Sequence, residues 1–179
     1  MEVLKTSASA CRFKSGRGHQ KKERRALDII FDIDDTLFDS SQRSHLYQGA
    51  DTDWTAFYAD SLNDTPISSS IAVLKSLYSA GHTIILATGR HEASREVTTR
   101  LLRRYNVCYD KLYMRPNSEV KKRNAQVKLD LLAEIRGDGY NPLAVFEDNP
   151  SSCSMWAGEG LIVYQVINDS VSKTNQLID

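Results

Sequence analysis

The chain has 179 residues, 41% hydrophobic and 26% charged, so it is long enough to bury a core and has the composition of a globular protein. No apolar run approaches the roughly 18 residues that a membrane-spanning helix needs. The three cysteines, Cys11, Cys108 and Cys153, are widely spaced and odd in number, which argues against both a disulfide framework and a cysteine metal site. We therefore expect a reducing, cytoplasmic location.

The net charge of zero hides an uneven distribution. Residues 1–25 carry eight Lys or Arg and two Glu, a net charge of +6, which leaves −6 on the rest of the chain. Because this segment is also poor in large apolar residues, we expect a disordered basic tail followed by one domain over residues 26–179. Three interpretations of the tail stay open: a solvated extension, an arm that attracts nucleic acid, and an Arg-rich targeting peptide.

Hydrophobic periodicity predicts alternating strands and helices along the rest of the chain. We expect strands at about 27–33, 83–87, 111–115, 143–146 and 161–166, and helices at about 53–62, 66–80, 91–105 and 120–136. Thr65–Pro66 has the pattern of a helix start, with Pro in the first turn. Such alternation predicts an α/β fold with a mostly parallel sheet that is covered on both faces.

Acidic residues follow the first predicted strand. Asp32 and Asp34, in Asp-Ile-Asp-Asp-Thr-Leu at 32–37, are two residues apart and would share a face. Two carboxylates this close repel unless a cation neutralises them, and Mg²⁺ prefers such oxygen ligands. A strand that runs into an Asx-type turn is the simpler interpretation.

Further polar residues follow the later strands, where the carboxyl edge of a parallel sheet usually holds the site. Thr88, Gly89 and Arg90 follow the second strand, Glu147 and Asp148 follow the fourth, and Lys128 lies near the start of a helix. Carboxylates for Mg²⁺, a hydroxyl beside a glycine turn and a lysine are together the groups that phosphoryl transfer requires.

These positions resemble the four motifs of the haloacid dehalogenase superfamily of phosphohydrolases. The resemblance covers roughly residues 27–167 and is closer still to the phosphatase module of phage polynucleotide kinase/phosphatases, through Ala87-Thr-Gly-Arg90, Tyr109-Asp110-Lys-Leu-Tyr-Met-Arg115 and Val127-Lys128-Leu. One departure is Glu147-Asp148-Asn149, where the family usually has Asp-Asp-Arg; the missing Arg weakens the assignment of the substrate. No Gly-x-x-x-x-Gly-Lys-Ser/Thr loop occurs in the sequence, so nothing in it indicates a kinase module of that type.

The resemblance implies a three-layer Rossmann-like fold and a Mg²⁺-dependent phosphatase that forms an aspartyl-phosphate. Asp32 is then expected to be the nucleophile and Asp34 the general acid and base. Thr88 is expected to bind phosphate oxygens, and Lys128 to offset negative charge. The metal is expected on Asp32, Asp34 (through its backbone carbonyl) and Asp148, with Glu147 supporting Lys128 or a water at the metal.

Thr88 lies 56 positions after Asp32, which leaves room for a small helical insert at about 38–65 but for no full cap domain. An open crevice can admit the end of a polymer. Together with this crevice, the resemblance implies 3′-phosphates at nucleic-acid ends as the substrate. The candidates for holding the substrate are Gly89, Arg43, Arg90 and Arg115, and the alternative for the arginines is ordinary surface charge. Trp54 and Tyr58 could stack on a base, although packing against the sheet is the simpler use.

Two other functions stay open on the same fold. One is a small-molecule nucleotidase or acid phosphatase, which the acidic body and the missing Arg favour. The other is an inactive module that binds nucleic-acid ends. The sequence does not indicate an oligomeric state.

Overall fold

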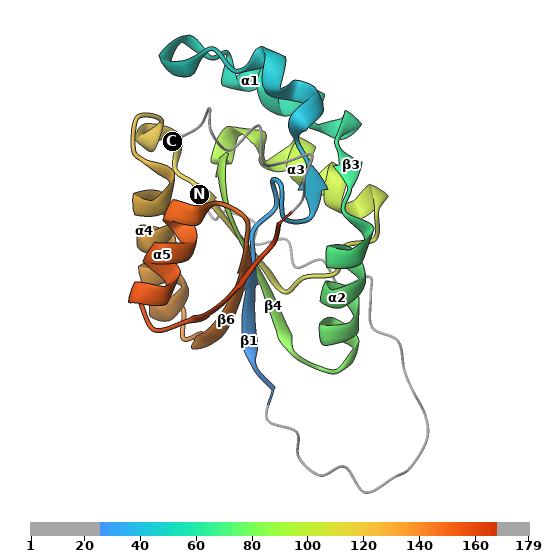
Figure 1. Cartoon of the computed structure of the whole chain (residues 1–179), viewed down its shortest axis with the longest axis vertical. Coiled ribbons are helices and arrows are strands. Elements are labelled where there is room, and N and C mark those ends of the chain that lie inside the picture. The colour runs from blue at the N-terminus through green and yellow to red at the C-terminus, as the bar shows by residue number, and fades with distance from the viewer. Residues whose placement is uncertain (1–25, 168–179) are drawn as a thin grey trace, which may run out of the picture.

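A parallel five-stranded sheet runs through the middle of the protein, which a computed structural model describes over residues 26–167 (Figure 1). In spatial order its strands are β5 (Lys111–Arg115), β4 (Thr83–His91), β1 (Asp28–Phe31), β6 (Pro142–Glu147) and β7 (Ile162–Gln165). Every neighbouring pair runs parallel, so the carboxyl ends of the strands meet at one edge. The predicted α/β fold with a parallel sheet is confirmed. The basic segment 1–25 lies outside the described residues.

Helices cover both faces of the sheet (Figure 1). They are α2 (Ser68–Ser79) and α3 (Arg95–Arg104) on one face, and α4 (Asn124–Gly137) and α5 (Pro150–Gly158) on the other; α1 (Trp54–Ala59) lies apart from them, in the insert described below. Side chains alternate across β1, so Ile29 and Phe31 pack in the core beneath α2 and α3. Ile30 packs in a second core beneath α4 and α5. Burial on both faces explains why this strand is apolar throughout its length.

A small antiparallel hairpin interrupts the chain between β1 and α2. It consists of β2 (Phe38–Asp39) and β3 (Thr65–Pro66), and the residues between them form short 3-10 helices and α1. This insert stands above the carboxyl edge of the sheet, at the top of Figure 1. The predicted helix start at Thr65–Pro66 is wrong, because α2 begins only at Ser68. Pro lacks an amide hydrogen and is tolerated in such an edge strand.

Two further elements differ from the prediction. β4 continues to His91, with a shift in its register to β5 after Thr88, so Thr88 lies inside a strand rather than after it. α5 lacks the helical periodicity of apolar residues that would predict it. Its local signals are Pro in the first turn and Asn149 as N-cap, whose side chain accepts a hydrogen bond from Ser152 N at 3.0 Å.

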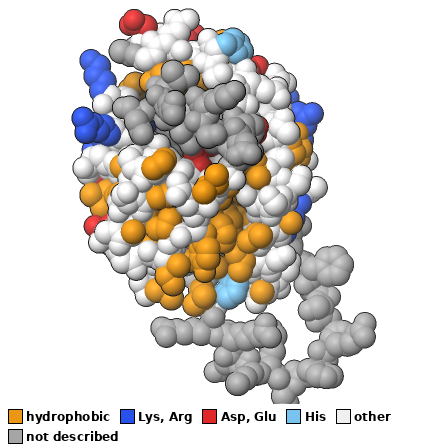
Figure 2. Space-filling view, viewed as in Figure 1, with side chains coloured by type: hydrophobic (Ala, Val, Ile, Leu, Met, Phe, Trp, Pro, Cys, Tyr) orange, Lys and Arg blue, Asp and Glu red, His pale blue; other side chains and the backbone are white. Residues whose placement is uncertain are grey.

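Several large apolar side chains are exposed in or beside the strands β6 and β7. They are Leu143, Ile162, Tyr164 and Ile167, and Val73 and Val120 are exposed elsewhere. Figure 2 shows hydrophobic side chains gathered on the lower half of the face drawn. None of the described helices is long and apolar enough to cross a membrane.

Candidate active site

Three buried carboxylates meet at the carboxyl edge of the sheet. Asp32 follows β1, and Glu147 and Asp148 lie at the end of the neighbouring strand β6; one oxygen from each lies within 4.8 Å of the others. The two strand ends are joined by a hydrogen bond from Asp32 N to Phe146 O at 3.0 Å. Lys128 reaches the cluster from α4, with Nζ 2.6 Å from Glu147 Oε2 and 3.3 Å from Asp32 Oδ1. The structure therefore brings together four residues that the sequence analysis selected.

Hydrogen bonds from neighbouring residues hold two of these carboxylates, Glu147 and Asp148, in place. Trp156 Nε1 donates to Glu147 Oε2 at 3.0 Å, and the backbone N–H of Asn149 donates to Glu147 Oε1 at 3.2 Å. Thr36 Oγ1 donates to Asp148 Oδ1 at 3.1 Å. With both oxygens engaged, Glu147 is suited to holding Lys128 in place.

The cluster fits a divalent metal ion. Asp32 Oδ1 is buried, and within the described residues it has no hydrogen-bond donor. Burial raises the pKa of Asp32 well above its ordinary value; Lys128 opposes this shift, whereas Glu147 and Asp148 add to it. Three carboxylates facing one lysine leave an excess of negative charge, which a cation would neutralise. Hard carboxylate oxygens are the ligands that Mg²⁺ prefers.

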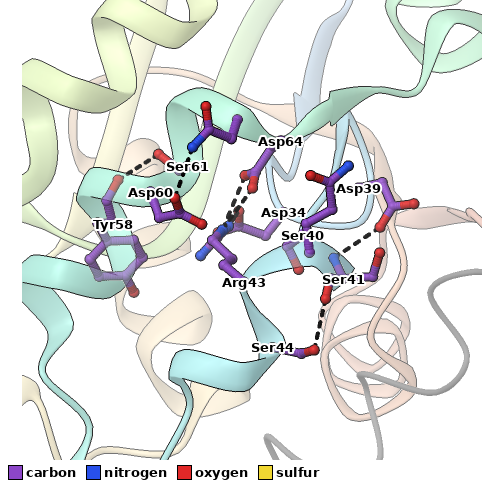
Figure 3. A network of polar contacts seen from close by, with 12 residues as sticks. Asp34, Asp39, Ser40, Ser41, Arg43, Ser44, Tyr58, Asp60, Ser61 and Asp64 are labelled. Atoms are coloured by element: carbon purple, nitrogen blue, oxygen red, sulfur yellow. Dashed lines mark hydrogen bonds and ion pairs between the residues drawn. The ribbon is translucent and has the colours of Figure 1, made fainter.

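Asp34 is held by two arginines, Arg43 and Arg90, on the side of the cleft toward the insert. Figure 3 shows Arg43 beside Asp34 and Asp64. Arg90 donates to its carboxylate from Nη2 at 2.6 Å and from Nε at 3.0 Å, and Arg43 also pairs with it through Nη2. Both arginines also contact Asp64, at 2.9 Å from Arg43 Nε and 3.3 Å from Arg90 Nη2. The two arginine side chains are at most 1% exposed, whereas that of Asp34 is 28% exposed. The two arginines thus hold the Asp34 carboxylate on its buried side, and its other side is open toward the cleft.

The two acids in this network titrate differently. Burial by itself would raise the pKa of Asp34, but Arg43 and Arg90 outweigh it and hold that pKa well below its usual range. Burial dominates at Asp64 and raises its pKa to about 6, although both arginines oppose the shift. Asp34 is therefore ionised in the free protein at neutral pH.

The end of β4 is fitted closely to the loop that follows β5. Thr88 is fully buried, and its Oγ1 accepts a hydrogen bond from Arg90 N at 3.2 Å. A Cβ atom at Gly89 would overlap with Oδ1 of Asn124, so the present position of the Asn124 side chain depends on glycine here. Arg115 donates to the backbone carbonyls of Gly89 at 2.9 Å and of Lys122 at 2.7 Å.

The three arginines predicted to hold the substrate thus have other partners. Arg43 and Arg90 contact Asp34 and Asp64, and Arg115 contacts backbone carbonyls and Asn124. All three are buried, so the alternative of ordinary surface charge is wrong. Arg43 and Arg115 line the cleft, whereas Arg90 lies behind Asp34.

An open cleft of about 570 Å³ leads to these groups. Its floor includes Asp32, Asp34, Thr88 and Asp148. One wall comes from the insert, with Tyr47, Trp54, Phe57 and Tyr58, and the facing wall comes from residues 120–124. Phe57 and Tyr58 are 6% exposed, which shows that these two rings serve mainly to pack the insert against the domain.

Two residues of the site were not singled out from the sequence. Asp64 precedes Thr65–Pro66, where the pattern of a helix start gives an acid an ordinary capping role. Thr36 lies within the first motif, but its contact with Asp148 depends on the pairing of β1 with β6. Two buried arginines require a buried carboxylate to balance their charge, and this requirement could have pointed to Asp64. The burial of the arginines, however, cannot be read from one sequence.

Comparison with known proteins agrees with this geometry. The family model described as polynucleotide kinase PNKP phosphatase domain matches residues 26–170. A chain of a Pnkp1/Rnl/Hen1 RNA repair complex is similar in structure, with a TM-score of 0.65, 29% identity, and coverage of 79% of this chain and 42% of that one. A second Pnkp1/Rnl/Hen1 complex gives 26% identity and the same TM-score, covering 79% of this chain and 46% of the other. This chain thus spans less than half the length of these two relatives.

A more distant similarity concerns the fold alone. The class C acid phosphatase from Bacillus anthracis with tungstate bound is 17% identical, with a TM-score of 0.57, and the match covers 86% of this chain and 74% of that one. No curated protein matches the chain in sequence.

Proposed function

The chain belongs to the family of polynucleotide kinase PNKP phosphatase domains and is a phosphatase, and on this premise we propose that it removes 3′-phosphates from nucleic-acid ends. The observation that carries the proposal is the open cleft above the carboxylate cluster, which the small insert walls on one side. A cleft of this kind can admit the end of a polymer. The similarity to a chain from an RNA repair complex also supports a nucleic-acid substrate.

Asp32 is proposed as the nucleophile. Its carboxylate forms a bond to phosphorus while the bond between phosphorus and the 3′-oxygen breaks, and water then attacks the aspartyl-phosphate to release inorganic phosphate. Lys128, 3.3 Å from Asp32 Oδ1 and held by Glu147, offsets negative charge on the nucleophile and the phosphoryl group. Thr88 lines the same cleft and is proposed to donate its hydroxyl to a phosphate oxygen.

Asp34 is proposed to give a proton to the leaving 3′-oxygen and later to take one from water. The two arginines keep it ionised in the free protein, so it must gain a proton when the substrate binds. A phosphate dianion in the cleft adds negative charge beside Asp34. It also attracts the two arginines and so weakens their stabilisation of the ionised carboxylate. Both effects raise the pKa of Asp34. Arg43 and Arg90 would thus position this carboxylate rather than bind the substrate.

Mg²⁺ is the proposed cofactor, with Asp32, Asp148 and the backbone carbonyl of Asp34 as ligands. When bound, it would neutralise charge on the carboxylates and phosphoryl oxygens. The carboxylate of Asp34 is engaged by the arginines, which leaves only its carbonyl for this role. Glu147 is engaged by Lys128 and Trp156 and would act by orienting the lysine.

The test compares phosphate release from a 3′-phosphorylated oligonucleotide, the same oligonucleotide with a 5′-phosphate, and 3′- and 5′-mononucleotides, all with Mg²⁺. Asp32→Asn serves as the control for contaminating phosphatase. We expect the 3′-phosphorylated oligonucleotide to have the highest kcat/KM. Asn149, where relatives usually carry Arg, favours the second candidate, a small-molecule nucleotidase. Mononucleotides hydrolysed as well as the oligonucleotide would establish that function instead.

A further inference from the structure

A basic loop forms the wall of the cleft that faces the insert, and the proposed reaction does not use it. The loop follows β5, and its residues Val120, Lys121, Lys122 and Arg123 line the cleft together with Asn124, the first residue of α4. Its cations stand on an otherwise acidic body, since residues 26–179 carry a net charge of −6. Such a local concentration of positive charge beside a phosphatase centre calls for an anionic ligand.

The loop is held in a defined position. Arg115 donates to the carbonyls of Glu119 and Lys122, at 3.0 and 2.7 Å, and to the carbonyl of Gly89 on β4 at 2.9 Å. One buried guanidinium therefore ties the loop to the strand end that carries Thr88. The basic wall is built as a fixed part of the site, at a set position relative to the reacting phosphate.

Five Lys and Arg side chains line the cleft, and three of them have acceptors within the protein. Arg43 pairs with Asp34 and Asp64, and Arg115 holds the loop. Lys122 pairs with Glu119 and Asp130. The remaining two, Lys121 and Arg123, are exposed and form no ion pair or hydrogen bond with any residue that the structure describes.

We propose that Lys121 and Arg123 form a subsite for the phosphodiester next to the terminal phosphate. The inference rests on the proposed function and deepens it, because it assigns the preference for a polymer to two named side chains. A phosphodiester carries one negative charge and two free oxygens, which suit charge-assisted contacts with a lysine and an arginine. A mononucleotide has no such group and would gain nothing from the loop.

The first experiment uses a ladder of substrates: 3′-phosphorylated mono-, di- and trinucleotides of one sequence. In the wild type, kcat/KM should rise from the mononucleotide to the dinucleotide, because the dinucleotide adds the first phosphodiester. In K121A/R123A this rise should shrink roughly tenfold. The matched control is R103A/R136A, which removes two exposed cations outside the cleft and should keep the full rise.

The second experiment measures binding without turnover. A fluorescent single-stranded oligonucleotide with a 3′-hydroxyl end is titrated with each protein at several salt concentrations, and its anisotropy is followed. The variant should bind more weakly, and the slope of log affinity against log salt should fall by about 0.7, because one phosphate of the single strand is no longer neutralised. Melting curves of both variants confirm that they are folded.

The outcomes separate the two proposals. If the wild type favours the 3′-phosphorylated oligonucleotide but K121A/R123A behaves like the control in both experiments, the loop subsite is overturned and the 3′-phosphatase proposal stands. If the wild type prefers mononucleotides yet the variant loses oligonucleotide affinity and salt dependence, the loop binds nucleic acid and the proposed substrate is wrong. Equal behaviour of both variants together with a preference for mononucleotides overturns both.

Discussion

Arg90 donates two hydrogen bonds from one edge of its guanidinium to the carboxylate of Asp34, from Nη2 at 2.6 Å and from Nε at 3.0 Å. Arg43 and Asp64 complete the arrangement, so that two buried cations alternate with two carboxylates. Such a network fixes the orientation of Asp34 before any substrate arrives. It also explains why two arginines beside a phosphatase centre are almost fully buried.

Arg90→Lys should lower kcat/KM for a 3′-phosphorylated oligonucleotide and for an aryl phosphate by similar factors, because lysine cannot form the two parallel hydrogen bonds to Asp34. We expect a loss of a hundredfold or more, mainly in kcat. Arg104→Lys is the matched control, since Arg104 is exposed and, within residues 26–167, donates a hydrogen bond only to Leu62 O. A rise in KM confined to the oligonucleotide would instead place Arg90 in contact with the substrate.

Substitutions of Arg90 also test the stability of the network. Removing one partner from a buried ion pair commonly costs about 3–5 kcal/mol, and Arg90→Ala should approach that range because it leaves Asp34 and Asp64 with one arginine. Arg90→Lys should cost less, since it retains the charge. Urea unfolding monitored by circular dichroism measures both differences, and a cost below about 1 kcal/mol for Arg90→Ala would contradict the structural role.

Asp32→Asn should abolish turnover of every phosphomonoester, because an amide cannot accept the phosphoryl group. The expected loss is several orders of magnitude in kcat, with the fold retained. Activity of Asp32→Asn within tenfold of the wild type would exclude this residue as the nucleophile.

Mg²⁺ should raise the melting temperature of the wild type. The rise should be smaller in Asp148→Asn, because this substitution removes one proposed ligand.

The gathering of Asp32, Glu147 and Asp148 could be predicted from the sequence for a physical reason. Apolar runs mark buried parallel strands, and the residues after such strands share one edge of the sheet. Lys128 reaches the same crevice from α4, and it was selected because it lies near the start of a helix and matches a motif of the family.

The partners of Arg43 and Arg90 could not be predicted in the same way. Their pairing with Asp64 depends on a two-residue hairpin, β2 with β3, that is too short to show periodicity. Arg115 likewise has the sequence context of a substrate-binding residue, yet it contacts carbonyls of a loop whose path no local pattern fixes. Long-range polar contacts of this kind are set by tertiary structure.

Removal of residues 1–25 tests the proposed division into a basic tail and a catalytic domain. Hydrolysis of an aryl phosphate should be nearly unchanged, because the matched domain begins at residue 26. If the tail attracts nucleic acid, kcat/KM for oligonucleotides should fall and become less sensitive to salt, since the segment carries a net charge of +6. Identical salt dependence with and without the tail would leave it a passive extension.

His91 should make folding stability depend on pH. It lies buried between Trp54 and Tyr58, and the centroids of their rings are 5.0 and 5.5 Å from that of His91. Burial is the larger cause that lowers the pKa of His91 to about 4, and the positive charge of Arg115 is the smaller cause. The unfolded chain takes up this proton near pH 6.5, so the contribution of neutral His91 is present above that pH and is lost as the pH falls toward 4. Between pH 7 and 4.5 the wild type should lose about 2–3 kcal/mol more than His91→Gln.

Urea unfolding at the two pH values measures this difference. Asp35 and Asp64, whose pKa values are raised to about 6, act in the opposite sense, but both proteins contain them and their contributions cancel in the comparison. Parallel stability curves for the wild type and His91→Gln would show that His91 is protonated as easily in the folded as in the unfolded state.

Gly89→Ala should damage the site through one identified clash. The added Cβ would overlap with Oδ1 of Asn124 and lie 3.2 Å from its Cγ, so the Asn124 side chain must move and its contact with Arg115 Nη2 would be disturbed. We expect a loss of about 1–3 kcal/mol in the free energy of unfolding, with lower kcat on all substrates because Thr88 is the preceding residue.

Asn124→Ala removes the clashing atoms, so the double variant Gly89→Ala/Asn124→Ala should be more stable than the sum of the two single changes predicts. Urea unfolding of the four proteins gives this coupling energy directly. A value near zero would mean that Gly89 is required for a reason other than its contact with Asn124.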